Sequence, residues 1–145
     1  MQEIEVKNVI IGKQFENSAN YEKFIKLVKE KNIKLYTVEA GQILNIEKNL
    51  HFEILWPDSK NVINDNVLNN NSLVCKLVYK NFSCIFTGDI EEIAEKAILE
   101  KYSTNLRNLN ATVLKVAHHG SKTSSIKEFL EAVRPKLVLI GVRRR

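Results

Sequence analysis

The segments FTGDIEE (residues 86–92) and LKVAHHGSKTS (residues 114–124) decide the fold class. In each, an apolar run ends in a glycine and in side chains that can bind a metal or transfer a proton, and a helical pattern follows. A strand that leads through a loop into a helix is the unit of α/β proteins, whose ligands bind beyond the carboxyl ends of the strands. The sequence therefore predicts an α/β fold with a candidate site at these two loops.

Apolar runs and turn residues predict further elements around these segments. Strands are expected at 6–11, 33–38, 42–46, 51–56, 72–79, 82–87, 111–117 and 136–142. Residues 57–71, dense in Asn and Asp, are the one clear loop. A tight hairpin is expected at Lys80-Asn81, because Asn tolerates positive φ.

Three helices are predicted from apolar residues at a spacing of three and four. The first is capped by Ser18. The second runs over 90–102 and would bury one face, made up of Ile90, Ile93, Ala94, Ala97 and Ile98. The third starts at about Ser125, which forms a capping box with Glu128.

Length and composition predict a single globular domain over residues 1–145. Hydrophobic residues make up 44% and charged residues 27%, which excludes a disordered chain. No apolar run approaches the roughly 18 residues that span a bilayer, and the first residues do not resemble a signal peptide. We therefore expect a soluble, cytoplasmic chain that would be membrane-associated only as part of a longer protein. Cys75 and Cys84 are expected to be buried free thiols.

The net charge of +5 is concentrated near the C-terminus. Residues 112–145 carry eight Lys and Arg against two Glu, a net of +6. A basic region can attract a polyanion such as nucleic acid by releasing its counterions. It can equally be a solvated surface with a basic end at Arg143, Arg144 and Arg145, so both interpretations stay open.

The two loops also allow two interpretations each. Asp89 could ligate a metal, or it could cap the following helix in a capping box with Glu92. His118 and His119 could belong to a metal site or to a solvated loop before the turn at Gly120. Since adjacent histidines point in different directions, at most one of them is expected to ligate directly.

Together these pieces resemble one family. The segments NNNSLVCKLVYKNFSCIFTGDIEE and TVLKVAHHGSKTSSIKEFLEAVRPKLVLI, in that order, are similar to the C-terminal half of a ComEC-type metallo-β-lactamase domain. The resemblance covers about residues 69–142. It implies a partial αββα sandwich, in which a mixed sheet with flanking helices faces a second sheet.

The resemblance also implies roles for particular residues. Asp89 and His118 would be catalytic and would ligate one or two divalent ions, Zn²⁺ or Mn²⁺. His119, Ser121 and Asn71 would contact the ligands or the substrate. Such ions lower the pKa of a bound water, and that hydroxide would cleave a phosphodiester such as DNA during uptake by competent cells.

One expected part of the family pattern is missing. The HxDxDH motif that supplies the first metal ligands does not occur in this sequence, so both ends look truncated. Because a catalytic zinc site usually needs three protein ligands, we expect weak metal binding and little or no activity from this chain alone. The strands at 72–79 and 111–117 would expose an apolar face to a separate N-terminal half or to a second copy. The alternatives are a non-catalytic basic module that binds nucleic acid or a partner, and another phosphoesterase of the same superfamily.

Overall fold

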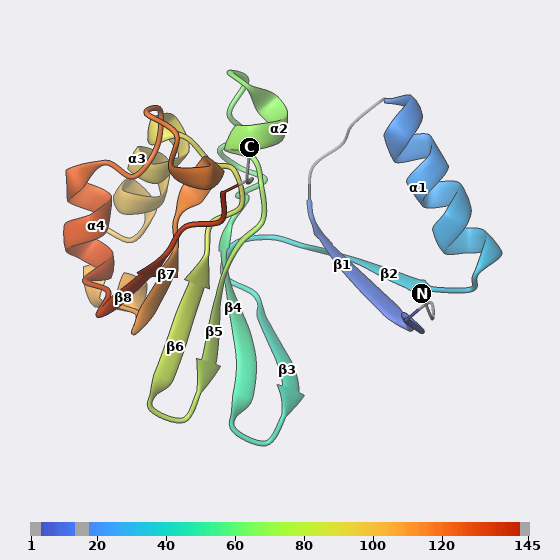
Figure 1. Cartoon of the computed structure of the whole chain (residues 1–145), viewed down its shortest axis with the longest axis horizontal. Coiled ribbons are helices and arrows are strands. Elements are labelled where there is room, and N and C mark those ends of the chain that lie inside the picture. Colours follow the sequence, from blue (N-terminus) through green and yellow to red (C-terminus); the bar gives the residue numbers. More distant parts are fainter. Residues whose placement is uncertain (1–3, 14–17, 143–145) are drawn as a thin grey trace.

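The computed structural model describes residues 4–13 and 18–142, which form helices around a mixed β-sheet (Figure 1). The strands of this part of the chain are β1 (Asn8–Gly12), β2 (Lys34–Val38), β3 (Ile43–Glu47), β4 (Leu50–Trp56), β5 (Val74–Tyr79), β6 (Phe82–Phe86), β7 (Val113–Lys115) and β8 (Leu137–Leu139). The helices are α1 (Ala19–Glu30), α2 (Val67–Asn70), α3 (Glu92–Lys101) and α4 (Lys127–Val133), with single turns η1 (Leu106–Leu109) and η2 (Ala117–Gly120). The predicted class, helices with a mixed sheet, is confirmed.

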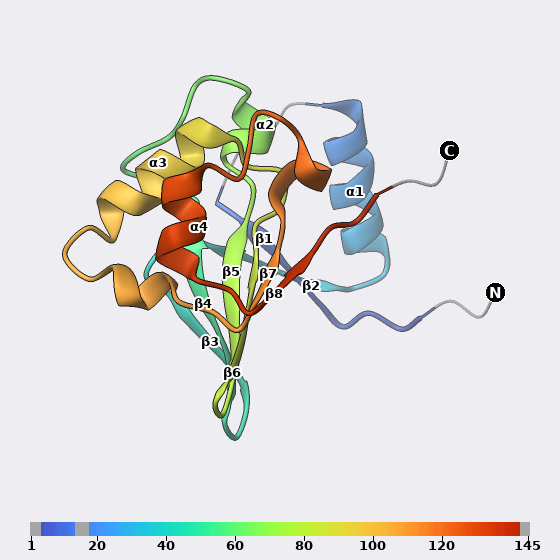
Figure 2. The ribbon, with the colours of Figure 1, turned by 60° about the vertical axis from the view of Figure 1, so that its left-hand side comes forward.

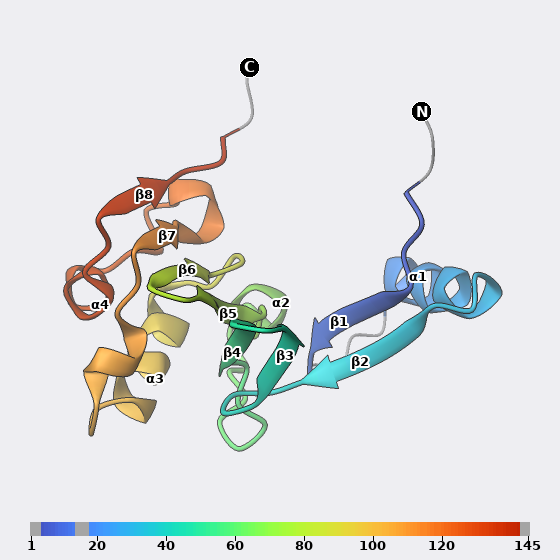
Figure 3. The same cartoon turned by 90° about the horizontal axis from the view of Figure 1, so that it is seen from below.

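Strands β3 to β8 form a six-stranded sheet in chain order. Strands β3 to β6 are antiparallel neighbours, whereas β6, β7 and β8 run parallel. A parallel pair needs a crossover connection, and α3 and α4 supply the two crossovers on one face of the sheet (Figures 2 and 3). The carboxyl ends of β6 and β7 therefore meet at one edge of the sheet, where both candidate loops begin.

Strands β1 and β2 form a separate parallel pair beside α1, as seen in blue in Figure 1. The predicted cap of α1 is confirmed, since the amide of Tyr21 donates to Ser18 Oγ over 3.1 Å. This pair approaches the larger sheet closely at Gly12, where an added Cβ would lie 2.9 Å from Pro57 Cδ. The facing second sheet implied by the resemblance stays a prediction.

The core lies between the six-stranded sheet and the helices α3 and α4. Its buried side chains come from β4 to β7 and from the two helices, and include Trp56, Ile85, Leu114, Ala94, Ile98, Phe129 and Val133. Trp56 is fully buried, and its Nε1 donates to the carbonyl of Asn70 over 2.7 Å. Asp58 accepts a 2.8 Å hydrogen bond from Lys101, which lowers the pKa of Asp58. These two contacts hold residues 57–71 against the core, and that predicted loop contains the short helix α2.

Both predicted capping boxes of the second half are wrong. Helix α3 has Glu91 at its N-cap, and the amide of Glu92 donates to the carbonyl of Thr123 instead of a local side chain. Helix α4 has Ile126 at its N-cap, also without a local side-chain bond. A distant carbonyl satisfies the first amide of α3, and the Glu95 carboxylate accepts from the two amides just before α4, at Ser125 and Ile126.

Two further local predictions differ from the structure. Ile93 is 44% exposed, whereas Glu95 is fully buried on the face of α3 that meets α4. The hairpin between β5 and β6 is present, but Lys80, at φ 52°, supplies its positive φ.

Both cysteines are free as predicted; Cys84 is buried, and burial raises the pKa of the half-buried Cys75 to about 11.

The sequence predicts an exposed apolar face on strands 72–79 and 111–117, and the structure differs in part. In β7, Val113 and Leu114 are buried, and Leu114 belongs to the core, whereas Tyr79 of β5 is 42% exposed. One group of exposed apolar side chains lies on the edge strand β8 and just after it: Leu137, Val138, Leu139 and Ile140. An apolar edge strand is a surface that other chains can pair with.

Candidate functional site

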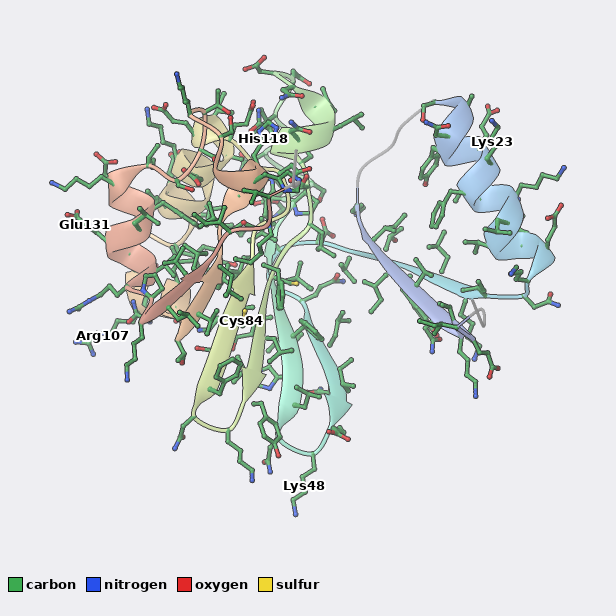
Figure 4. The ribbon with its side chains drawn as sticks, in the orientation of Figure 1. Lys23, Lys48, Cys84, Arg107, His118 and Glu131 are labelled. Atoms are coloured by element: carbon green, nitrogen blue, oxygen red, sulfur yellow. The ribbon has the colours of Figure 1, made fainter. Side chains whose placement is uncertain are left out.

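The two loops meet at the carboxyl ends of β6 and β7. The amide of His118 donates to the carbonyl of Gly88 over 3.1 Å, and Thr87 Oγ1 donates to the carbonyl of Lys115 over 2.6 Å. Asp89 follows directly after Gly88. Figure 4 shows His118 at this edge of the sheet, close to the short helix α2. Because β6 and β7 pair in parallel, the two loops that follow them meet at one edge of the sheet, as the sequence predicts.

The histidine turn has a strained backbone. His118, His119 and Gly120 have φ values of 45°, 55° and 77°. Positive φ is uncommon for residues other than glycine, although histidine tolerates it better than most. Such strain is held only where the surroundings fix it, and it clusters at functional sites. The turn sends the two histidine side chains to different neighbours.

His119 lies beside Asp89. Its Nδ1 is 2.7 Å from the carbonyl oxygen of Gly141, and because a carbonyl can only accept, Nδ1 carries the proton. The other ring nitrogen, Nε2, lies 3.8 Å from Asp89 Oδ1. Both side chains are about half exposed, at 63% and 46%. Asp89 and His119 therefore present a carboxylate and an imidazole nitrogen together at the surface.

His118 contacts a different carboxylate. Its Nδ1 is buried and lies 3.4 Å from Glu91 Oε1, outside hydrogen-bond geometry and with no other hydrogen-bond partner. The ring as a whole is 31% exposed. Since Nδ1 is buried, only Nε2 is left as the ring nitrogen that could bind a ligand from solvent.

Glu91 joins three segments of the chain. Its Oε2 accepts from Asn66 Nδ2 over 3.0 Å, and its Oε1 accepts from Thr123 Oγ1 over 2.9 Å. Its backbone amide donates to Asn70 Oδ1 over 3.0 Å. The hydrogen bonds from Asn66 and Thr123 lower the pKa of Glu91 below its usual value. Glu91 is thus an ionised carboxylate that ties residues 57–71 and the loop after His119 to the start of α3.

The other two predicted site residues, Asn71 and Ser121, form hydrogen bonds with other residues of the chain. Asn71 is 2% exposed, and its amide bonds to Ile63 and to the carbonyl of Val67 within its own segment. Ser121 Oγ lies 3.0 Å from Thr123 Oγ1, next to the bond between Thr123 and Glu91. Asn71 thus shapes the loop, and Ser121 supports the Glu91 contact.

Sequence reasoning missed Asn70, Glu91, Glu95 and Thr123. Glu95 accepts from the amides of Ser125 and Ile126 over 2.7 and 2.8 Å, so it fixes the end of the histidine loop. Asn70, fully buried, joins α2 to Glu91. No local pattern marks these four residues, because each acts through a contact with a segment distant in sequence.

The turn at Gly88 should not accept a side chain. We expect Gly88→Ala to destabilise the protein by more than about 1 kcal/mol, because φ is +59° and the new Cβ would lie 2.8 Å from Ser72 Cβ. Gly41→Ala is the matched control, since φ is +95° but nothing lies within 4 Å of its Cβ. Urea denaturation measures both. Equal losses for the two variants would contradict the close packing at Gly88.

The donors here suit a divalent ion in kind but not in number. Carboxylate and imidazole ligands are those that Zn²⁺ and Mn²⁺ accept in proteins. Across residues 4–13 and 18–142, however, the structure contains no group of three or more His, Cys, Asp or Glu arranged to hold an ion. A complete site would need donors beyond those gathered here. His51, next to Glu53 at the far end of the sheet, does not take part.

Comparisons with known proteins relate this chain to proteins named for competence and recombination. No protein-family model matches the chain. It is 34% identical over 136 residues, 94% of its length, to ComE operon protein 3 of Bacillus subtilis. It is 38% identical over 85 residues to competence protein ComA of Neisseria gonorrhoeae, and 35% identical over 92 residues to recombination protein 2 of Haemophilus influenzae.

These relatives support a competence, or DNA-uptake, family, and the chain is related to one segment of such proteins. The chain spans between 10% and 16% of the length of these three relatives. In the part of the chain that the structure describes, no helix is long and apolar enough to cross a membrane.

Proposed function

We propose that this chain forms one side of a divalent-metal site for phosphodiester hydrolysis in a DNA-uptake protein, and that alone it is a poor catalyst or none. The observation that carries the proposal is the contact between the two loops, which places Asp89 beside His119 and holds His118 next to Glu91. The relationship to competence proteins supports DNA as the substrate class.

The proposed roles follow from the exposed atoms. Asp89 would offer a carboxylate to the ion, and His118 would offer Nε2, because its Nδ1 is buried. His119 can bind the ion or a phosphate oxygen, since its Nε2 faces the same space as Asp89. Zn²⁺ and Mn²⁺ are the ions that fit these donors. The remaining ligands would come from another part of a longer protein or from another chain.

DNA cleavage by the purified chain tests this proposal. With Mn²⁺ or Zn²⁺ present, we expect no more cleavage of linear DNA than with a chelator, because too few ligands are gathered here. Robust turnover that Asp89→Ala and His118→Ala abolish would overturn the predicted inactivity. DNA binding that falls steeply with salt and ignores chelator would favour the non-catalytic basic module instead. Arg143, Arg144 and Arg145, half of the basic excess, lie outside the described residues.

We expect the isolated chain to self-associate through the edge strand β8. Its Leu137 and Leu139 are 54% and 48% exposed, and Ile140 just beyond is 57% exposed. Apolar edges of this kind pair with other strands. Light scattering should show an oligomer in the wild type and a shift toward monomer in Leu139→Lys, with Lys136→Glu as a control on charge alone. A monodisperse wild-type monomer would contradict the prediction.

A further inference from the structure

We infer that Glu91 is a positioning residue for His118: its carboxylate holds the proton of the ring on Nδ1 and so leaves the lone pair of Nε2 directed at the candidate site. The inference rests on the proposed function for its purpose, but the contact itself can be tested without metal. Glu91 lies two residues after Asp89, at the N-cap of α3.

The contact has the atoms that such a role needs. His118 Nδ1 is buried, so it cannot reach a ligand from solvent, and its near neighbour is Glu91 Oε1 at 3.4 Å. A neutral imidazole has one donor and one acceptor nitrogen, and a carboxylate can only accept. A proton on Nδ1 therefore faces an acceptor and can donate to it if the contact shortens, whereas a proton on Nε2 would leave two lone pairs facing each other.

The carboxylate is held in place independently of the histidine. Asn66 and Asn70 contact Oε2, and Thr123 donates to Oε1. These donors come from two different segments, so Oε1 cannot swing away from His118 without breaking bonds to both. This network fixes the acceptor beside the buried Nδ1.

The present separation suits a contact that closes on ligand binding. Hydrogen bonds at such sites are often long or poorly aligned in the free protein and tighten when the ligand is present. A ligating histidine commonly donates its second nitrogen to a carboxylate, which fixes the tautomer and the ring orientation. Loss of such a partner costs about tenfold to a hundredfold in metal affinity.

The test reads the tautomer directly, in the full metal-free chain. Long-range ¹H–¹⁵N spectra at about pH 8, where an unperturbed histidine is neutral, report which nitrogen of His118 carries the proton. His118→Gln assigns the signal among the three histidines. We expect the Nδ1–H form in the wild type, its loss or mixing in Glu91→Ala, and its retention in Glu91→Gln, whose side-chain oxygen can still accept.

Glu92→Ala is the matched control. It is the next residue, 54% exposed, and pairs with Lys96 on the outer face of α3. An Nε2–H tautomer in the wild type, or the same tautomer in Glu91→Ala, would overturn the inference. If Glu91→Ala does not fold, the wild-type tautomer still decides, because an Nε2–H form there would overturn the inference.

Zinc titration of the same variants separates the inference from the proposed function. We expect Glu91→Ala to bind Zn²⁺ about tenfold or more weakly than the wild type. If the tautomer depends on Glu91 but the wild type binds no Zn²⁺, the positioning role stands and the metal site fails. If the wild type and Glu91→Ala bind Zn²⁺ equally, the metal site stands and the positioning role is overturned.

Discussion

Glu95→Ala is expected to lower the free energy of unfolding by about 2–4 kcal/mol. Glu95 is fully buried and accepts from the amides of Ser125 and Ile126, which begin the segment leading into α4. Its removal would leave two buried donors without an acceptor, at roughly 1–3 kcal/mol each. Urea denaturation measures the loss. Glu92→Ala, on the exposed side of the same helix, should stay within about 0.5 kcal/mol of the wild type.

The same carboxyl predicts a dependence on pH. Burial raises the pKa of Glu95 above its ordinary value of 4.5, although the amides of Ile126 and Ser125 offset part of that effect. The folded state therefore keeps a proton that the unfolded state has lost. Stability should fall as pH rises from 4.5 through the raised pKa, and Glu95→Gln should remove this slope. A slope unchanged in Glu95→Gln would show that other groups cause it.

Trp56→Ala should cost about 3–5 kcal/mol of stability. The indole is fully buried, and its N–H holds the carbonyl of Asn70. Truncation would leave a large cavity and free residues 57–71 from the core. Trp56→Phe keeps most of the packing but loses the donor, so it should cost about 1–3 kcal/mol. A loss below about 1 kcal/mol for Trp56→Ala in urea denaturation would contradict its place at the centre of the core.

The substitution Trp56→Ala should also affect the candidate site. Asn70 accepts from the amide of Glu91 through its side chain and from Trp56 through its carbonyl. Loss of the indole would loosen the segment that holds Glu91, and with it the contact to His118. The His118 signal should therefore broaden in Trp56→Ala at temperatures where the protein is still folded.

Elements defined by local sequence could be predicted. Ser18 caps α1 as expected, because the cap and the amide that it satisfies lie three residues apart. The strands β4 to β7 follow their apolar runs, and the class follows from the alternation of strands and helices in the second half. In each case the pattern that predicts the element lies within a short stretch of sequence.

Contacts between residues distant in sequence explain why the capping box at Asp89 and the buried face of α3 were predicted wrongly. The capping box at Asp89 is absent because the carbonyl of Thr123, thirty-one residues after Glu92, takes the first amide of α3. Glu95 can be buried because the amides of Ser125 and Ile126, just before α4, donate to its carboxylate. A local pattern cannot show which distant segment will satisfy a helix end.

For the candidate site, the position could be predicted from the sequence, but the orientation of the two histidines could not. The meeting of Asp89 with the histidine loop follows from two strands whose carboxyl ends share an edge. Which histidine faces Asp89 could not be predicted, because it depends on the positive φ of both His118 and His119. The structure puts His119 beside Asp89, and the role of each residue toward a metal stays a prediction.

Titration of the chain with Zn²⁺ by calorimetry tests most directly whether the two loops form one metal site. We predict weak, saturable binding that Asp89→Ala and His118→Ala each reduce and that their combination removes. His51→Ala, at the other end of the sheet, should bind as the wild type does. Equal binding by the wild type and the double variant, or no binding by the wild type, would contradict the account.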